Sequence, residues 1–550
     1  MSTSGVLVHE RRRFRAPAQD RGVFCDPPPA ALPAIVAGNQ ARLAESTLEL
    51  QGRRLVDLAR KARADLLRTA YDQTAQYRSV RERPAADSAL FLAGHQAEMF
   101  HPGVWAKHFF LDRFAKEWSA SHGPATAVNL VIDSDTWKST SLYAPGGSRS
   151  APTRAAIAFD SDGGQANVPT EERPVVDAEL WSSFGQRLAE HVAPLVAGPL
   201  IRDAWPRVMA RWQAGERPGA AVAQARHQIE GAWGLDTLEL PISATCRFES
   251  FHWFVAHLAA QWPVWREVYN QAVHEYRRAN RIRSRNHPVP DLALDGDWHE
   301  MPLWIWTAED PRRRRLFMRQ TKGTCTLTDR AGWTLDLPLS PQGDAAGAVQ
   351  VLAHAAAAGI KIRTRALTTT LWARLFLGDL FVHGIGGAKY DQLTDTLIQR
   401  FFGIDPPGYA ALSATLFLPV ERPGVSPEDL RRIDGQLREL VYHPERWLDL
   451  ASLSADERTA ATAWMESKHR WVATEPTIQN ARQRTREIRA ANAALQPWVE
   501  RSRTMLRQER DETGRAWQRE SLLASREYSI FLYPEKILRD FLLAFRPATL

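Results

Sequence analysis

The sequence predicts an α/β protein with a doubly wound parallel sheet and a C-terminal helical region. Three observations favour this class. The apolar run Leu90–Ala93 stops at Gly94 and is followed by Val104–Trp118, whose apolar residues have helical spacing. A second apolar run, Ala125–Ile132, comes directly afterwards. A strand, a glycine loop, a helix and a second strand form a right-handed βαβ unit, and a third strand–glycine–helix pattern appears near residue 380.

Length and composition limit the classes of protein that fit. A chain of 550 residues predicts two or three domains, or one large domain with insertions. Its 44% hydrophobic and 24% charged residues are typical of soluble globular proteins. No stretch resembles a transmembrane helix or a signal peptide. Cys25, Cys246 and Cys325 lack metal-ligand spacing and fit a reducing compartment. We therefore expect a cytoplasmic protein that binds no membrane.

The net charge of +7 comes with a large excess of arginine over lysine. The runs Arg11–Arg13 and Arg312–Arg315 are not interleaved with aromatic residues on a recognisable nucleic-acid module. The basic balance favours a small-molecule substrate with phosphate or carboxylate groups over nucleic acid, and the base composition of the genome would explain it equally well.

The domain boundaries follow from changes in pattern along the chain. Residues 1–87 are expected to be an N-terminal extension with one or two helices, and 88–425 the α/β core. The core is interrupted by insertions at about 139–234 and 286–340. The first begins with antiparallel strands over Thr140–Asp160 that turn at Gly146-Gly147. Further core elements are a strand over Leu235–Ser243, a helix over Phe248–Arg285 kinked at Pro263, and a strand over Ala411–Val420.

The third strand–glycine–helix pattern is Leu380–Val382, the loop His383–Gly387 and the helix Ala388–Phe402. The loop is neither a G-x-G-x-x-G nor a Walker sequence. Its glycines allow close approach either of a ligand or of another backbone segment, and both readings stay open.

Residues 426–526 are expected to form a helical, coiled-coil-like domain, and residues 527–550 a tail that docks on the core. Either a self-contained bundle or a homodimer fits the charged helical pattern. The predicted apolar seam comprises Ile478, Ile488, Leu495, Val499 and Leu506.

Ligands of open α/β sheets bind beyond the carboxyl ends of the strands, so the candidate site collects polar residues that follow them. No metal cluster is expected among the histidines. The catalytic candidates are His95, Asp133 and Asp135. The substrate-binding candidates are Gly94, Gln96, Lys107, Arg365, Gly384, Gly386, Gly387, Lys389, Tyr390 and Gln392.

Three segments resemble one known family. Gly94–Phe100, with Pro102-Gly103 and Lys107, resembles the G-Q-Q-x-x-x-F…G-P…K segment of the bacillithiol biosynthesis enzyme BshC, a cysteine-adding ligase. Gly386-Gly387, Tyr390 and Gln392-Leu393 resemble its G-G…Y…Q-L segment, and Leu532-Tyr533-Pro534 its terminal L-Y-P. The resemblance runs thinly from Ser88 to Phe545.

The resemblance implies a Rossmann-like core with two insertions, a C-terminal coiled coil used for dimerisation, and amide formation between cysteine and a glucosaminyl malate. ATP or ADP with Mg²⁺ is implied by the resemblance alone. The chain departs from the family pattern at four places, so its substrates are expected to differ. Asp133–Thr136 replaces an E-D-H-D run, His95-Gln96 a glutamine pair, Lys389 an acidic residue, and Arg365-Ala366 an arginine-proline segment.

Three functions remain open. An amide-forming ligase needs a base, for which Asp133, Asp135 or His95 is a candidate, and a cation such as Lys107, Lys389 or Arg365 to hold a carboxylate or phosphate. A glycosyltransferase would use Asp133 and Asp135 to hold a divalent ion on a nucleotide sugar. A non-catalytic dimeric scaffold on a decayed α/β core would use the helical region as its working surface.

Overall fold

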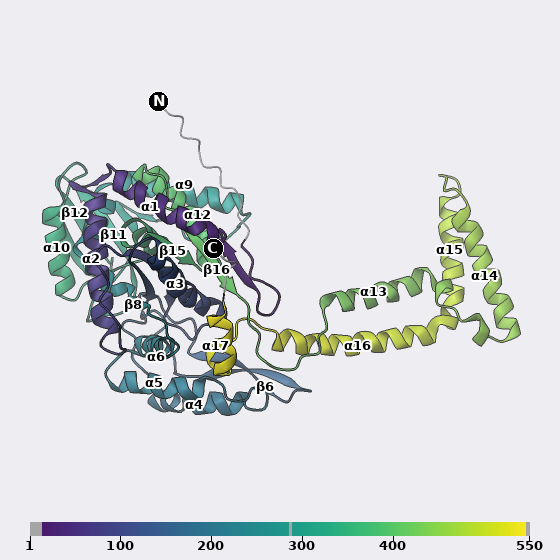
Figure 1. Cartoon of the computed structure of the whole chain (residues 1–550). Coiled ribbons are helices and arrows are strands. Elements are labelled where there is room, and N and C mark those ends of the chain that lie inside the picture. Colours follow the sequence, from purple (N-terminus) through teal and green to yellow (C-terminus); the bar gives the residue numbers. More distant parts are fainter. Residues whose placement is uncertain (1–13, 285–288, 546–550) are drawn as a thin grey trace. The chain divides into compact units, whose positions relative to one another are not determined.

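The computed structural model describes residues 14–284 and 289–545, which form two compact units (Figure 1). The first unit contains the described residues up to 146, residues 155–419 and the tail from 526. The second contains residues 147–154 and 420–525. Each unit is described by itself below.

The first unit is built on a six-stranded sheet with the order β1-β16-β15-β4-β5-β8. Only β1 is antiparallel to its neighbour. The chain passes from β4 outward through β5 to β8 and then returns to the other side of β4 for β15 and β16, so the direction of strand addition reverses between β4 and β15. This confirms a mostly parallel α/β core. The strands are β1 (Val23–Asp26), β4 (Ala89–Gln96), β5 (Ala125–Ile132), β8 (Leu238–Pro241), β15 (Leu380–His383) and β16 (Ala410–Ala414).

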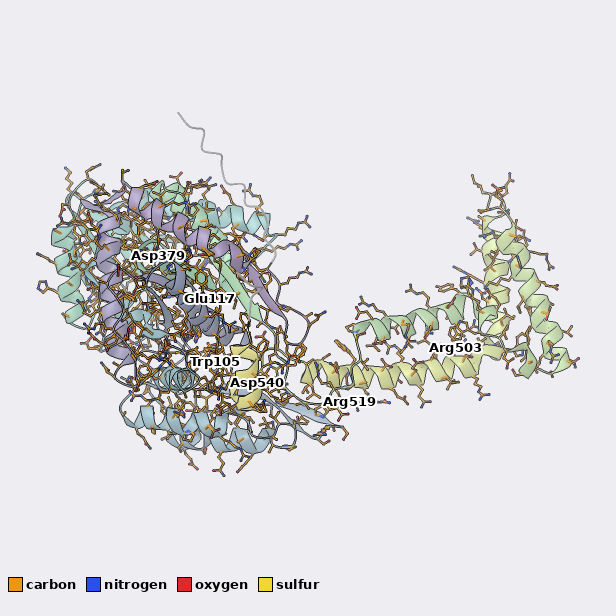
Figure 2. The ribbon with its side chains drawn as sticks, in the orientation of Figure 1. Trp105, Glu117, Asp379, Arg503, Arg519 and Asp540 are labelled. Atoms are coloured by element: carbon orange, nitrogen blue, oxygen red, sulfur yellow. The ribbon has the colours of Figure 1, made fainter. Side chains whose placement is uncertain are left out.

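Helices cover both faces of this sheet, which explains why its strands are continuous apolar runs. Along β4, Leu90 and Leu92 join the core formed with α2, α8, α11 and α12, while Phe91 faces α3, with its ring centroid 4.7 Å from that of Phe114. Figure 2 shows Asp379 inside the unit, where it accepts hydrogen bonds from Arg63 and from the Leu90 amide. The helices are α1 (Leu32–Glu45), α2 (Leu55–Thr74), α3 (Pro102–Ser121), α7 (Ile242–Thr245), α8 (Glu249–Ala260), α9 (Trp262–Ala279), α10 (Ala346–Ala357), α11 (Ala366–Trp372), α12 (Ile385–Leu397) and α17 (Glu535–Leu543).

Two further groups of elements are attached to this core. One begins with the hairpin of β6 (Ser141–Gly147) and β7 (Pro152–Ala158) and continues as α4 (Ala178–Val192), α5 (Ile201–Gln213) and α6 (Pro218–Ala232). The other is an antiparallel sheet with the order β13-β12-β11-β10-β14. Its strands are β10 (Trp298–Trp306), β11 (Arg314–Thr321), β12 (Thr324–Thr328), β13 (Thr334–Pro338) and β14 (Lys361–Thr364), and β9 (Leu294–Asp295) pairs with β10.

Several predicted boundaries are wrong for local reasons. The first hairpin turns after Gly147, where the Ala151 amide donates to Ser148, and not at Gly146-Gly147. The break in the long helix falls at Gln261, because Pro263 lies in the first turn of α9, where a proline needs no amide partner. The predicted strand Ala411–Val420 ends at Ala414.

The second unit is helical, as expected for the C-terminal region. It contains α13 (Pro427–Tyr442), α14 (Ala455–Ala473), α15 (Ala481–Leu495) and α16 (Glu500–Leu523). Figure 1 shows α14 beside α15 and α13 beside α16. Val499 and Leu506 pack against α13, but Ile478 lies in the turn between α14 and α15 and is 101% exposed, so the predicted seam does not reach it.

The C-terminal tail belongs to the first unit. The Ile530 amide donates to Phe100, and the Tyr533 hydroxyl donates to the Leu416 carbonyl at 2.7 Å. Among the described helices, none combines the length and the apolarity needed to cross a membrane.

Candidate functional site

Asp133 and Ser243 join the carboxyl ends of β5 and β8. The Ser243 amide and hydroxyl donate to the Asp133 carboxylate at 3.0 and 2.5 Å. Asp133 is 8% exposed, and burial together with the nearby charge of Glu171 raises its pKa to about 7. A carboxyl group that titrates near neutral pH is suited to take a proton from a substrate and return it, which is the work of a general base.

The antiparallel sheet meets this edge through an ion pair. Arg363 on β14 donates two hydrogen bonds to Glu171, at 3.0 and 3.2 Å. The Glu171 amide in turn donates to the Asp133 carbonyl at 3.0 Å. Arg363 therefore lies close enough to lower the pKa of Asp133, against the larger opposite effects of burial and Glu171.

Asp135 leads to a second arginine cluster. Its carboxylate accepts from Arg313 at 2.9 Å, and Arg313 lies 4.3 Å from the centroid of the Trp304 ring. Arg365 lies 4.1 Å from the same centroid and donates to Glu300 at 2.7 Å. Its Nε and Nη2 atoms are buried and have no partner within the described residues. Buried donors without acceptors cost free energy, and a carboxylate or phosphate would satisfy both.

His95 on β4 and Lys107 on α3 are buried near the carboxyl end of β4 and are not exposed at the edge of the sheet. The strand β4 continues through Gly94 to Gln96, paired with β5 throughout, so His95 is a strand residue and not a loop residue. Its side chain is buried, its Nδ1 lies 3.0 Å from the Gln96 carbonyl, and burial holds its pKa well below the ordinary value. Lys107 donates to the Gly94 carbonyl at 2.6 Å, and burial lowers its pKa to about 8. The half-buried Gln96 side chain makes no hydrogen bond with the described residues.

A buried polar cluster surrounds these two residues. Arg226 on α6 pairs with Glu230 and with Glu239 on β8, and Nδ1 of His108 lies 2.7 Å from Glu230. Trp105, visible inside the unit in Figure 2, donates to Glu230 at 2.6 Å. The buried atoms of this cluster that have no hydrogen-bond partner among the described residues are Nε2 of His95 and His108, both amide atoms of Asn129, and Oε2 of Glu230.

Interiors usually satisfy such groups with ordered water, so this cluster can hold internal water beside the sheet. The sequence pattern did not indicate this cluster. The i,i+4 spacing of Arg226 and Glu230 was the available signal, but such pairs are usually solvent-exposed.

The glycine segment after β15 is mostly the first turn of α12, not a loop, because the Ala388 amide already donates to the Gly384 carbonyl. A Cβ atom added at Gly384 or Gly386 would meet nothing within 4 Å, whereas at Gly387 it would lie 2.8 Å from Nδ1 of His383. The close-packing reading therefore applies to Gly387, whereas the approach of a ligand to Gly384 and Gly386 stays a prediction. Gly384 and Gly386 leave the helix N-terminus open, and Gly387 allows close packing.

The remaining predicted residues lie along α12. Lys389 is exposed and its carbonyl accepts from the Tyr276 hydroxyl at 2.8 Å. Tyr390 is half-buried and Gln392 is 9% exposed. The structure thus places the residues in three groups: Asp133 and Asp135 with the arginines, His95 and Lys107 in the interior, and the glycines with Lys389 at the start of α12.

The loops after β4 and β5 also enclose a cavity of about 130 Å³. Its walls include Ala97, Glu98, Trp137 and Trp181, and Trp137 donates to the Ala97 carbonyl at 3.0 Å. The indole N–H of Trp181 is buried without a partner in the described ranges, and burial raises the pKa of Glu98. The sequence analysis did not predict this cavity, because tryptophans in such patterns usually fill cores.

The donor set does not fit the Mg²⁺ that the resemblance implied. Within residues 14–284 and 289–545, no group of three or more His, Cys, Asp or Glu residues could hold a metal ion. Both oxygens of Asp133 accept from Ser243 and one oxygen of Asp135 accepts from Arg313, so a cation here would compete with these contacts.

Comparison with known proteins assigns no family to this chain. No protein-family model matches it, and no curated protein matches it significantly.

Proposed function

We propose that this chain is a Rossmann-like, BshC-like enzyme that forms an amide between an amino-acid amine and a carboxylate-bearing substrate. The observation that carries the proposal is Asp133, whose pKa is raised to about 7 at the carboxyl edge of the sheet. The unused donors of Arg365 near the same edge support an anionic substrate. The reversal of strand addition between β4 and β15 supports ligand binding at this edge.

The proposed reaction assigns a task to each group. The amine nitrogen attacks the carbonyl carbon of a carboxyl group that is already activated, as an acyl phosphate would be. As the C–N bond forms, Asp133 takes one proton from the nitrogen. The bond to the phosphate then breaks, and the phosphate leaves with the bonding electrons. Ser243 holds the Asp133 carboxylate in place, and Arg365 holds an anionic group of the substrate. No step is assigned to a metal ion.

A dimeric scaffold is the second candidate. Val472 is 51% exposed and Ile478 fully exposed near the turn between α14 and α15, and apolar side chains in such positions are common in protein–protein interfaces. Sedimentation of the purified chain would test for the dimer.

A thermal-shift panel tests the ligase. The ligands are cysteine, glucosaminyl malate, citrate, ATP, ADP and uridine sugars, each with and without Mg²⁺. A ligand at about a hundred times its Kd should stabilise the protein by roughly 2.7 kcal/mol. We expect a shift with anionic ligands that is lost in Arg365→Lys, which keeps the charge but not the planar fork. The exposed Arg312→Lys is the matched control.

A flat panel from folded protein would overturn the proposal and favour the scaffold. A shift that requires both a uridine sugar and a divalent ion would favour the glycosyltransferase instead.

A further inference from the structure

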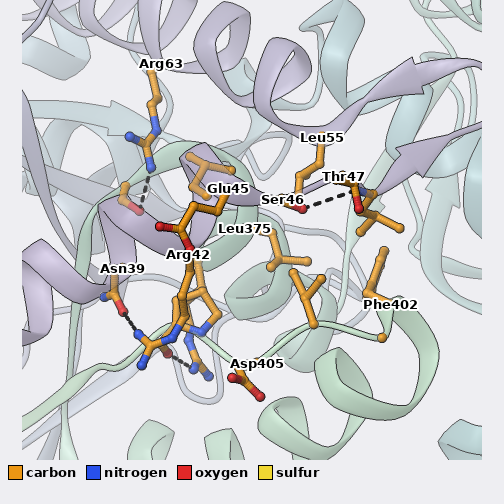
Figure 3. Close-up of a pocket in the computed structure, with 17 residues that line it drawn as sticks. Asn39, Arg42, Glu45, Ser46, Thr47, Leu55, Arg63, Leu375, Phe402 and Asp405 are labelled. Atoms are coloured by element: carbon orange, nitrogen blue, oxygen red, sulfur yellow. Dashed lines mark hydrogen bonds between the residues drawn. The ribbon is translucent and has the colours of Figure 1, made fainter. Parts of the chain in front are cut away.

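A separate cavity of about 430 Å³ lies at the opposite edge of the parallel sheet (Figure 3). It is lined by α1, by the start of α2, by the turn that leads into β15 and by the segment after α12. Gly378 at the cavity and Gly384 at the carboxyl edge are six residues apart along β15, a span of about 20 Å. The cavity is therefore distinct from the site around Asp133.

One side of the cavity is apolar. Figure 3 shows Leu55, Leu375 and Phe402 together on this side. This surface can accept an apolar group of a ligand, and the volume is within the range of small-molecule sites. The apolar lining residues are Leu43, Leu48, Leu55, Leu375, Phe402 and Ile404.

The other side carries guanidinium groups with unused donors. The Arg374 side chain is 1% exposed and pairs with Asp391 and Asp395, yet its Nε has no partner in the described chain. Arg63 donates through its Nη atoms to Asp379 and to the Gly378 carbonyl, and its buried Nε has no partner among the described residues. Arg42 donates only to Asn39, at 3.3 Å, as drawn in Figure 3, and pairs with no carboxylate of the described residues.

Two carboxylates share this side with the arginines. Glu45 and Asp405 line the cavity, and neither has an ion pair or a side-chain hydrogen bond within the ranges that the structure describes. Glu45 follows Arg42 by one turn on α1, and both are drawn in Figure 3. The cavity therefore combines unused donors, unused carboxylates and an apolar wall.

We propose that this cavity binds a free α-amino acid with an apolar side chain. Its carboxylate would accept from Arg42, and its ammonium group would donate to Glu45 and Asp405. A simple anion would be repelled by the two carboxylates, and a simple amine by the guanidinium groups. An amino acid at neutral pH carries both charges about one carbon apart. Because the cavity is remote from Asp133, the amino acid acts here as a regulator and not as a reactant.

Isothermal titration of the full chain tests this. The probes are leucine and phenylalanine, with analogues that lack one charge: 4-methylpentanoate and 3-phenylpropanoate without the ammonium group, isoamylamine and phenethylamine without the carboxylate. We expect the amino acids to bind at least about tenfold more tightly than either analogue, a difference of about 1.4 kcal/mol. Arg42→Gln and Glu45→Gln should each weaken binding by a similar factor.

Two controls separate this site from the rest of the molecule. Arg60→Gln changes an exposed arginine of α2 outside the cavity lining and should leave binding unchanged. Asp133→Asn should also leave amino-acid binding unchanged. The inference can therefore fail while the ligase proposal stands, and the ligase proposal can fail while the inference stands. The absence of binding by any amino acid would overturn the inference. So would equal affinity for an amino acid and one of its single-charge analogues.

Discussion

Replacing Asp133 by asparagine should make the protein more stable at alkaline pH while removing the proposed base. Burial raises the pKa of this carboxyl group from its ordinary 3.8 to about 7. Between these values the folded chain keeps a proton that the unfolded chain releases. The unfolded state then binds fewer protons, so the free energy of unfolding falls as the pH rises.

The size of the effect follows from the two pKa values. The raised pKa costs the folded state about 2 kcal/mol at about pH 5, where the buried group keeps its proton, and about 4 kcal/mol at about pH 8, where it is largely ionised. The wild type should therefore lose roughly 2–3 kcal/mol between these pH values through Asp133 alone, and Asp133→Asn should not lose it. Comparing two pH values cancels the constant cost of exchanging a hydroxyl for an amide group.

Urea unfolding at both pH values, followed by tryptophan fluorescence, measures the difference. Asp57→Asn is a matched control, because Asp57 is an exposed helix residue paired with Arg60. Its pH dependence should equal that of the wild type. If Asp133→Asn shows the same pH dependence as the wild type, Asp133 is not a group with a raised pKa, and the assignment of the base loses its support.

Two further predictions concern residues of α12 and their neighbours. Gly387→Ala should lower the free energy of unfolding by about 1–3 kcal/mol because the new Cβ would meet His383. Gly386→Ala should change it by less than about 0.5 kcal/mol. Equal shifts of the two variants in thermal melts would contradict this prediction. Arg374→Met should cost about 3–5 kcal/mol because it leaves Asp391 buried without its cation. If urea unfolding shows almost no change in the free energy of unfolding, the Asp391 carboxylate does not depend on Arg374 for its stabilisation, and the prediction is wrong.

The parallel core could be predicted because its strands are buried on both faces. Ala125–Ile132 was predicted with its observed bounds, and Leu380–Val382 within one residue. Gly94 was read as the end of a strand because glycine usually marks a break, yet strand pairing with β5 continues to Gln96. Because the strand continues three residues beyond its predicted end, His95 lies in the interior and not in a loop.

The candidate site was less predictable than the core. Asp133 was identified because it follows a buried strand, but its raised pKa depends on burial and then on Glu171, which is distant in sequence and reaches it through backbone pairing. The sharing of Trp304 by Arg313 and Arg365 likewise needs the register of the antiparallel sheet. Periodicity in a single sequence carries no information on such pairings.

The antiparallel sheet has a consequence for how this protein can change over evolution. Arg363 and Trp304 lie on that sheet and Arg313 and Arg365 directly flank its strands, whereas Asp133 follows a strand of the parallel sheet. In the proposed ligase, the groups that would recognise the anion and the group that would take the proton are therefore encoded in different segments of the gene. Mutation or recombination within the segment of the antiparallel sheet could then alter which anion is accepted while the strand before Asp133 stays unchanged.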